Sequence, residues 1–140
     1  MPKGSPEFIN ALNEALAEEM ASSIQYLWHH IMARGMESVA VVDKFRELSM
    51  VEMRHGYAIA ERIDLLGGVP STAIGPIKVG GDVRKMLQDD LDAEYEAIAM
   101  YRRLVKQAER EDDPGSRRLL EEILRETEEH ARDLESMLGR

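Results

Sequence analysis

The stretch Gly67–Asp82, which reads GGVPSTAIGPIKVGGD, decides how the rest of the chain can fold. Its glycines and prolines rule out a continuous helix, and its 16 residues can span about 50 Å when extended. A helix of about 28 residues is only about 42 Å long. The stretch can therefore cross the whole length of a helical bundle, which allows the helices on either side of it to lie parallel.

Two shorter turn signals, ARGMES at 33–38 and EDDPGS at 111–116, divide the rest of the chain. The segments between them carry apolar residues at spacings of three and four, which is typical of helices with one face in a common core. We predict helices at 6–34, 38–66, 81–110 and 115–138. Because the first and third connections are short, each joins an antiparallel pair. The sequence thus predicts an all-α fold, an antiparallel four-helix bundle with a long crossover between the second and third helices, in a single domain at 1–140.

Composition narrows the class of protein and its partners. The 140 residues are 44% hydrophobic and 32% charged, as in a soluble globular domain. Cysteine is absent, so a bound metal would have to be held by oxygen and nitrogen ligands. The net charge of −9 disfavours nucleic acid and attracts cations. The sequence has no apolar leader and no run of about 18 apolar residues, so we expect a cytoplasmic protein without a membrane segment.

The stretch VEMRHG at 51–56 places two ionisable residues on the inner face of the second predicted helix. Glu52 and His55 fall in a stripe whose other members include Phe45, Leu48, Ile59 and Leu66. The same interruption occurs once on each other helix, at Glu19, Glu94 and His130. All five lie near the midpoints of their helices, so we expect them to meet at one level of the bundle. Of the adjacent His29 and His30, only His30 is expected near the inner face, and neither is expected to bind metal.

Carboxylates buried together would repel one another or take up protons, so we expect a positive group among them. Carboxylates with imidazoles and no thiolate suit Fe, Mn or Zn. A single inward histidine is more commonly a hydrogen-bonded core residue, and a single inward glutamate can reflect a misjudged helix face. Five such residues at one height favour a centre that holds metal ions over a polar cluster with a structural role.

Four motifs resemble those of the bacterioferritins, which belong to the ferritin-like superfamily. They are LAEEMASSIQYL, in which Glu19 precedes Tyr26 by seven residues, EMRH at 52–55, DLDAEYEA around Glu94, and EILRETEEH ending at His130. The superfamily pattern is a Glu from each of two helices and Glu-x-x-His from each of the other two. The crossover is also similar, and the resemblance extends over essentially the whole chain.

The resemblance implies a ferroxidase-type oxidoreductase, which binds Fe²⁺, oxidises it with O₂ or H₂O₂ and stores the ferric product. Its dinuclear iron centre would use Glu19 and Glu94 as terminal ligands and Glu52 as a bridging ligand. His55 and His130 would each supply one nitrogen. These five residues are the expected metal-binding and catalytic set.

Three further residues surround this set. The resemblance implies that Tyr26 holds one carboxylate in place. Thr127, three residues before His130, stands where the family has a second bridging Glu. Glu126 faces roughly the same side and could replace that metal ligand after a slight rotation of the helix. Without such a replacement, Thr127 lies beside the metal site without binding it, and the site would bind one metal or bind two weakly.

Assembly and haem binding are the remaining features that the resemblance addresses. The sequence ends at Arg140 without the short fifth helix of bacterioferritins, which leaves open a large cage, a different shell or a dimer. Met53 matches the family's haem-ligating methionine, one from each of two subunits, so haem b is a candidate cofactor, and plain packing of Met53 is the alternative. A second apolar stripe predicts a homodimer through the first and second helices; its members are Met20, Ile24, Trp28, Met50, Met53 and Tyr57.

Other functions remain open on the sequence alone. One is a di-metal peroxidase or catalase that stores no iron. Another is a haem-binding or metal-binding dimer without oxidase activity, in which Thr127 has disabled oxidation. A third is a bundle whose polar centre is only structural.

Overall fold

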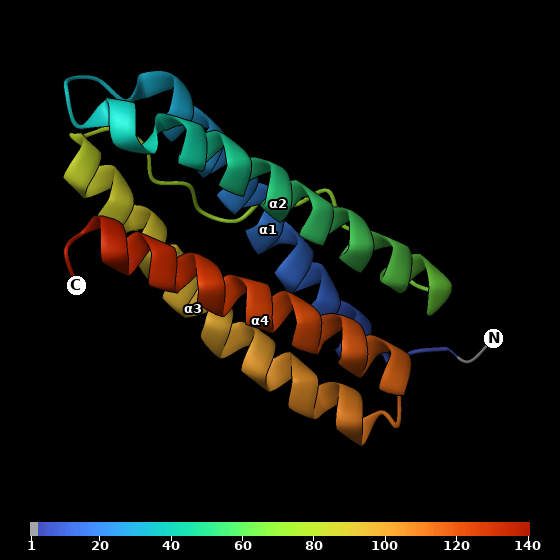
Figure 1. Ribbon diagram of the computed structural model, residues 1–140. Coiled ribbons are helices and arrows are strands. Elements are labelled where there is room, and N and C mark those ends of the chain that lie inside the picture. The colour runs from blue at the N-terminus through green and yellow to red at the C-terminus, as the bar shows by residue number, and fades with distance from the viewer. Residues whose placement is uncertain (1–2) are drawn as a thin grey trace.

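Four helices make up most of the chain that the structure describes. The computed structural model describes residues 3–140, with α1 at Pro6–Met32, α2 at Ser38–Leu65, α3 at Val83–Arg110 and α4 at Pro114–Met137 (Figure 1). Every helix end lies within two residues of its predicted position. Within residues 3–140 there is no fifth helix, and no helix is both long enough and apolar enough to cross a membrane. The predicted all-α four-helix architecture is confirmed.

Side-chain caps fix where three of the helices begin. Ser5, Asp82 and Asp113 each accept a hydrogen bond from the backbone N–H three residues later, at 3.1, 2.8 and 3.0 Å. Asp113 also accepts hydrogen bonds from the Ser116 hydroxyl and, at 2.8 Å, from the guanidinium of Arg62 in α2. The start of α4 is therefore tied to the end of α2.

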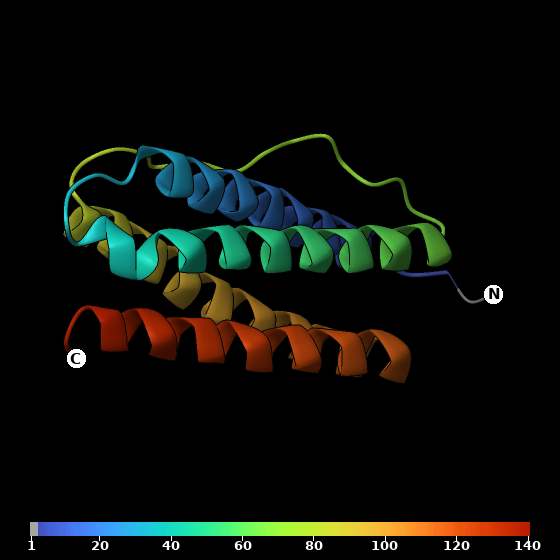
Figure 2. The ribbon, with the colours of Figure 1, turned by 45° about the horizontal axis from the view of Figure 1, so that its top comes forward.

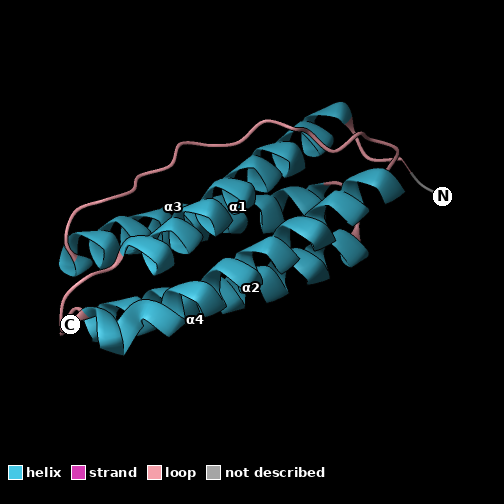
Figure 3. Cartoon of the chain, turned by 90° about the horizontal axis from the view of Figure 1, so that it is seen from above, coloured by secondary structure: helices cyan, strands magenta, loops and turns pink. Residues whose placement is uncertain are grey.

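The long crossover gives the bundle its parallel pair of helices. α1 and α2 are antiparallel neighbours, as are α3 and α4, and the crossover returns the chain along the bundle so that α2 and α3 run the same way (Figure 1, Figure 2). Seen from above, the crossover follows the outside of the bundle (Figure 3). Four hydrogen bonds hold it along α1. Asn13 donates to the Val69 carbonyl at 3.1 Å and accepts from Ser71 N–H at 2.7 Å, Gly75 N–H donates to the Ala17 carbonyl at 3.1 Å, and Lys78 N–H donates to Gln25 Oε1 at 2.8 Å.

Two apolar clusters fill the core, one towards each end of the bundle. The first includes Phe8, Leu12, Ile59, Tyr101 and Leu120. The second includes Tyr26, Phe45, Leu48, Leu91 and Leu134. The five predicted metal ligands are all buried and fall between the members of the two clusters on their helices, and they are Glu19, Glu52, His55, Glu94 and His130. A polar layer therefore divides the core.

Gly56 lets α1 and α2 approach closely beside that polar layer. A Cβ atom at this position would lie 2.2 Å from Met20 Cε and 3.7 Å from Glu19 Cβ. The missing side chain thus brings the helix turns that carry Glu19 and His55 next to each other.

The double role of Asp113 predicts a stability effect larger than that of an ordinary cap. Asp113→Ala should lower the free energy of unfolding by about 2–3 kcal/mol, because it removes both a cap and the carboxylate that pairs with Arg62. Asp82→Ala is the matched control, since Asp82 caps α3 through the same kind of bond, and it should cost about 1 kcal/mol. Urea unfolding of both variants measures the difference, and equal losses would contradict the role of the Arg62 contact.

The contribution of Asp113 should also depend on pH. Burial alone would raise the pKa of Asp113, but hydrogen bonds from Ser116 and the charge of Arg62 lower it below its usual 3.8. A carboxyl whose pKa is lowered on folding stabilises the protein above its unfolded pKa, and that stabilisation is lost as the pH falls through the folded pKa. The difference between wild type and Asp113→Ala should therefore shrink below about pH 4. A difference that stays constant down to about pH 2.5 would be inconsistent with this effect.

Candidate metal centre

The five predicted ligands converge from four helices in the middle of the bundle. Two groups of residues could each hold a metal ion: Glu19 with Glu52 and His55, and Glu52 with Glu94 and His130. The ligand atoms within each group lie within 4.8 Å of one another. Glu52 belongs to both groups, as a carboxylate that bridges two ions must.

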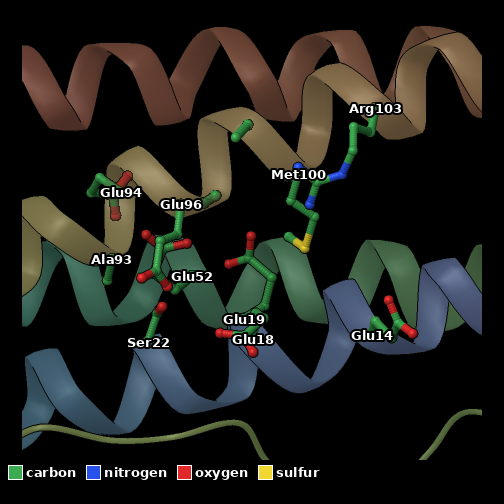
Figure 4. A pocket seen from close by; sticks show the side chains of 12 residues that line it. Glu14, Glu18, Glu19, Ser22, Glu52, Ala93, Glu94, Glu96, Met100 and Arg103 are labelled. Carbon is green, nitrogen blue, oxygen red and sulfur yellow. The ribbon is translucent and has the colours of Figure 1, made fainter.

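This site is screened from solvent on nearly all sides. Glu19 and Glu52 are each 3% exposed, Glu94 is 2% exposed, and His55 and His130 are 5% and 8% exposed. Figure 4 shows the glutamates extending from α1, α2 and α3 towards a common hollow. Burying three carboxylates side by side costs several kcal/mol for each unless positive charge or protons neutralise them.

Unpartnered atoms at the site fit a bound cation. Glu19 Oε2, Glu94 Oε2 and His130 Nδ1 are buried without a hydrogen-bond partner in the described part of the chain. Buried polar atoms of this kind are rare because leaving them unsatisfied costs free energy. His130 Nδ1 lies 3.5 Å from Glu52 Oε1 and 3.7 Å from Glu94 Oε2, separations that suit donors facing one ion between them. Carboxylate oxygen with imidazole nitrogen is a donor set that Fe, Mn and Zn accept.

Glu126 lies outside both groups. Its carboxylate contacts Nε2 of His55 at 2.5 Å, whereas Nδ1 of the same ring faces Glu52 at 3.3 Å and Glu19 at 3.6 Å. Glu126 therefore meets the ring nitrogen that points away from the shared glutamates. In this position it can orient His55 and increase the basicity of the other nitrogen, which differs from the expected role as a replacement metal ligand.

Two tyrosines hold the outer glutamates in a crossed arrangement. Tyr26 on α1 donates a hydrogen bond to Oε1 of Glu94 at 2.8 Å, and Tyr101 on α3 donates one to Oε1 of Glu19. Tyr26 contacts a carboxylate as the resemblance implied. Tyr101 is not among the predicted site residues, although its spacing of seven from Glu94 repeats the spacing of Tyr26 from Glu19 and could have identified it.

Thr127 supplies no charge to the site. Its side chain is 1% exposed, and its hydroxyl donates to the carbonyl of Ile123 in its own helix at 2.8 Å. The hydroxyl is therefore occupied within α4. The α4 helix contributes His130 to the group with Glu52 and Glu94, and it contributes no carboxylate to either group.

In the absence of a cation, protons reduce the repulsion between the glutamates. Burial, and after it the charges of Glu19 and Glu94, raises the pKa of Glu52 well above its usual value. Burial alone would raise the pKa of Glu19, but hydrogen bonds with Glu52 and His55 lower it. Burial alone would lower the pKa of His55, but Glu19 and Glu126 raise it. We therefore expect cation binding at this site to compete with proton binding at Glu52 and His55.

A second buried polar cluster lies beside the site. His29 is fully buried, and its Nδ1 lies 2.9 Å from Oδ2 of the fully buried Asp90, one helix turn from Glu94. Gln25 donates to Oδ1 of Asp90 at 2.8 Å. The expectation that only His30 would lie near the inner face was wrong, because His29 is the buried one, while His30 is half-buried and bonds the Val42 carbonyl. The partner that buries His29 comes from α3, which the periodicity of α1 alone does not reveal.

The second apolar stripe predicted on the first two helices, called the outer stripe below, is partly exposed on α1 and α2. Trp28 and Met53 are 43% and 48% exposed, Met50 is 52% exposed and Tyr57 is 68% exposed. Met53 thus lies outside the metal centre, on a surface apolar enough to contact another protein chain.

Comparisons with known proteins agree with this geometry. A family model described as a ferritin-like domain matches residues 9–140. A bacterioferritin from Mycobacterium leprae is 34% identical over 138 residues, which cover 98% of this chain and 87% of the relative. A bacterial ferritin from Synechocystis sp. is 37% identical over 139 residues, covering 98% of this chain and 89% of the relative. A solved structure of a mycobacterial bacterioferritin has a TM-score of 0.92 and 33% identity, covering 98% of this chain and 86% of that one.

The ferritin-like fold and the resemblance to bacterioferritins are confirmed by these matches, and the buried Glu and His residues form a di-metal site typical of a ferroxidase centre. The chain belongs to the ferritin-like family and is a relative of the bacterioferritins.

Proposed function

We propose that this protein binds two Fe²⁺ ions per chain at Glu19, Glu52, His55, Glu94 and His130, oxidises them with O₂ or H₂O₂, and contributes to iron storage. The observation that carries this proposal is the sharing of Glu52 by two ligand groups. A shared carboxylate supports two ions at one site, where a single group would support one. Glu19 and Glu94 are the terminal ligands, each held by a tyrosine from the opposite helix.

A pair of irons suits this chemistry because O₂ and H₂O₂ are safely reduced by two electrons at a time. Two Fe²⁺ with O₂ and two protons give two Fe³⁺ and H₂O₂, and two Fe²⁺ with H₂O₂ and two protons give two Fe³⁺ and two H₂O. The residues of the chain position the substrate ions and hold them in the buried centre of the bundle. Anionic oxygen ligands favour the ferric product over the ferrous substrate.

The two metal positions are expected to differ in affinity. Three carboxylates carry a total charge of −3 against +4 on two ferrous ions, and Thr127 adds none. His55 has Glu126 at its outer nitrogen, whereas Nδ1 of His130 is buried without a hydrogen-bond partner in the part of the chain that the structure describes. We therefore expect the position at Glu19 and His55 to fill first and the position at Glu94 and His130 to fill second.

Anaerobic titration of metal-free protein with Fe²⁺ should give two ions per chain for the wild type and about one for His130→Ala, because the variant lacks the only α4 ligand. Glu128→Gln is the control, since Glu128 is exposed on α4 and should leave the count unchanged. Admitting O₂ to the loaded wild type should then produce ferric absorbance within seconds to minutes. One ion or none in the wild type, without ferric absorbance, would overturn the proposed function.

Thr127→Glu should restore the missing charge and tighten binding of the second ion by about tenfold or more. Thr127→Gln is the matched control, because glutamine has nearly the same size and no charge. Equilibrium titration with Fe²⁺ or Co²⁺ under anaerobic conditions measures both affinities. Equal affinities in the two variants would mean that charge at position 127 does not limit occupancy.

We further propose a homodimer through α1 and α2, with Met53 as a haem ligand from each subunit. The half-exposed thioether and its apolar neighbours support this proposal. Haemin added to the wild type should bind at one per two chains and give a six-coordinate spectrum. Met53→Leu should lose that spectrum while sedimentation still shows a dimer.

Met36→Leu is the control for the haem experiment, because Met36 is 94% exposed and lies outside the outer stripe. It should retain the wild-type haem spectrum. Unchanged haem binding in Met53→Leu would assign Met53 to packing alone.

A further inference from the structure

A methionine of α3 reaches into a hollow that the metal centre also lines. The hollow has a volume of about 480 Å³, and its wall includes Glu19, Glu52, Glu94 and Met100. Figure 4 shows the sulfur of Met100 directed from α3 into this hollow, towards the α1 side from which Glu19 extends. A thioether and three of the proposed metal ligands therefore face the same space.

Met100 is the sulfur group that an oxidant in this hollow would meet. No other residue that lines the hollow in the described part of the chain carries sulfur, and the sequence has no cysteine. Met20 follows Glu19 in the sequence, but its methyl carbon packs against Gly56 of α2, and it does not line the hollow. Met100 itself is half-buried and packs against the first apolar cluster, which limits its contact with bulk solvent.

The chemistry of a thioether suggests a role for Met100 other than binding iron. Thioether sulfur is a soft ligand, whereas the carboxylates and imidazoles of this site suit harder ions. Peroxide, however, oxidises methionine to its sulfoxide. The O–O bond of H₂O₂ breaks, one oxygen forms a bond to sulfur, and the other leaves with both protons as water. Sulfur loses two electrons in this step, and the peroxide gains them.

We propose that Met100 is oxidised to methionine sulfoxide by H₂O₂ that is formed at the neighbouring glutamates. This inference rests on the proposed function, because the oxidation of two Fe²⁺ by O₂ supplies the peroxide. Each loading of a chain with two Fe²⁺ yields one H₂O₂, and one methionine consumes one. Confinement of both reactants in one hollow raises their effective concentration, so the reaction does not depend on exposure to solvent.

Met36 and Met86 provide internal references for this modification. Met36 is 94% exposed, so it reports peroxide that is free in solution. Met86 is 2% exposed within the second apolar cluster, so it reports oxidation that follows a general loosening of the core.

The test compares two sources of peroxide by mass spectrometry of peptides. In the first sample, metal-free protein receives two Fe²⁺ per chain and O₂ while catalase destroys peroxide in solution. Met100 should then carry about tenfold more sulfoxide than Met36, because catalase cannot enter the hollow. In the second sample, metal-free protein receives H₂O₂ without iron or catalase, and Met36 should be oxidised ahead of Met100 because exposure limits the reaction. Met86 should stay reduced in both samples.

The reversal of order between the two samples is the decisive result. If Met36 were oxidised as much as Met100 in the sample with iron and catalase, the proposal would be overturned. Oxidation of Met86 together with Met100 would also overturn it, because the modification would then follow from loss of packing.

A variant tests whether Met100 consumes peroxide. Met100→Leu removes the sulfur and keeps an apolar side chain of similar size. Without catalase, this variant should release more H₂O₂ into solution per Fe²⁺ oxidised than the wild type. Met36→Leu is the matched control and should release the wild-type amount. Equal release from Met100→Leu and the wild type would mean that Met100 does not consume the peroxide.

Failure of the proposed function gives a different result. If the wild type with Fe²⁺ and O₂ gave no ferric absorbance, the ferroxidase function and the oxidation of Met100 would fall together. If ferric absorbance appeared and Met100 stayed reduced, only the modification site would fall.

Discussion

The repulsion among three buried carboxylates is the constraint on which the rest of the structure depends. Glu19, Glu52 and Glu94 face one another at the centre of the bundle, each at most 3% exposed. Such an arrangement is unfavourable unless protons or cations neutralise it. The surrounding residues offset this repulsion. Tyrosines hydrogen-bond to Glu19 and Glu94, and histidines complete the donor sets for a cation. The apolar clusters at both ends of the bundle supply the stability that the polar centre does not.

The two halves of the chain repeat the same design with one difference. Glu19 and Tyr26 on α1 correspond to Glu94 and Tyr101 on α3, with the same spacing of seven residues and reciprocal hydrogen bonds. Glu52 and His55 on α2 would correspond to a Glu and His130 on α4, but Thr127 occupies the first position. The two halves therefore differ in charge at this position. The Thr127 hydroxyl bonds the carbonyl of Ile123 in its own helix, and α4 supplies no carboxylate there.

The sequence predicted the helices, the crossover and the five converging ligands, because periodicity and turn residues determine which face of a helix is buried and at what height. It did not predict contacts that depend on a side chain from another helix. His29 is buried through Asp90, and Glu126 meets the outer nitrogen of His55, and neither partner is indicated by spacing within one helix. The sequence could have indicated Tyr101, since it follows Glu94 by seven residues, as Tyr26 follows Glu19. The single-domain organisation of residues 1–140 and the catalytic roles of the site residues stay predictions.

Because a polar layer divides the core, metal bound in that layer would also raise the stability of the folded protein. The two apolar clusters lie on either side of the glutamates and histidines, so a cation at that level would link all four helices. A ligand that binds only the native state stabilises it in proportion to the logarithm of its concentration above the dissociation constant. A cell with little iron would then hold this chain in a less stable form that proteases degrade faster, so that the abundance of the protein follows the supply of the ion it handles.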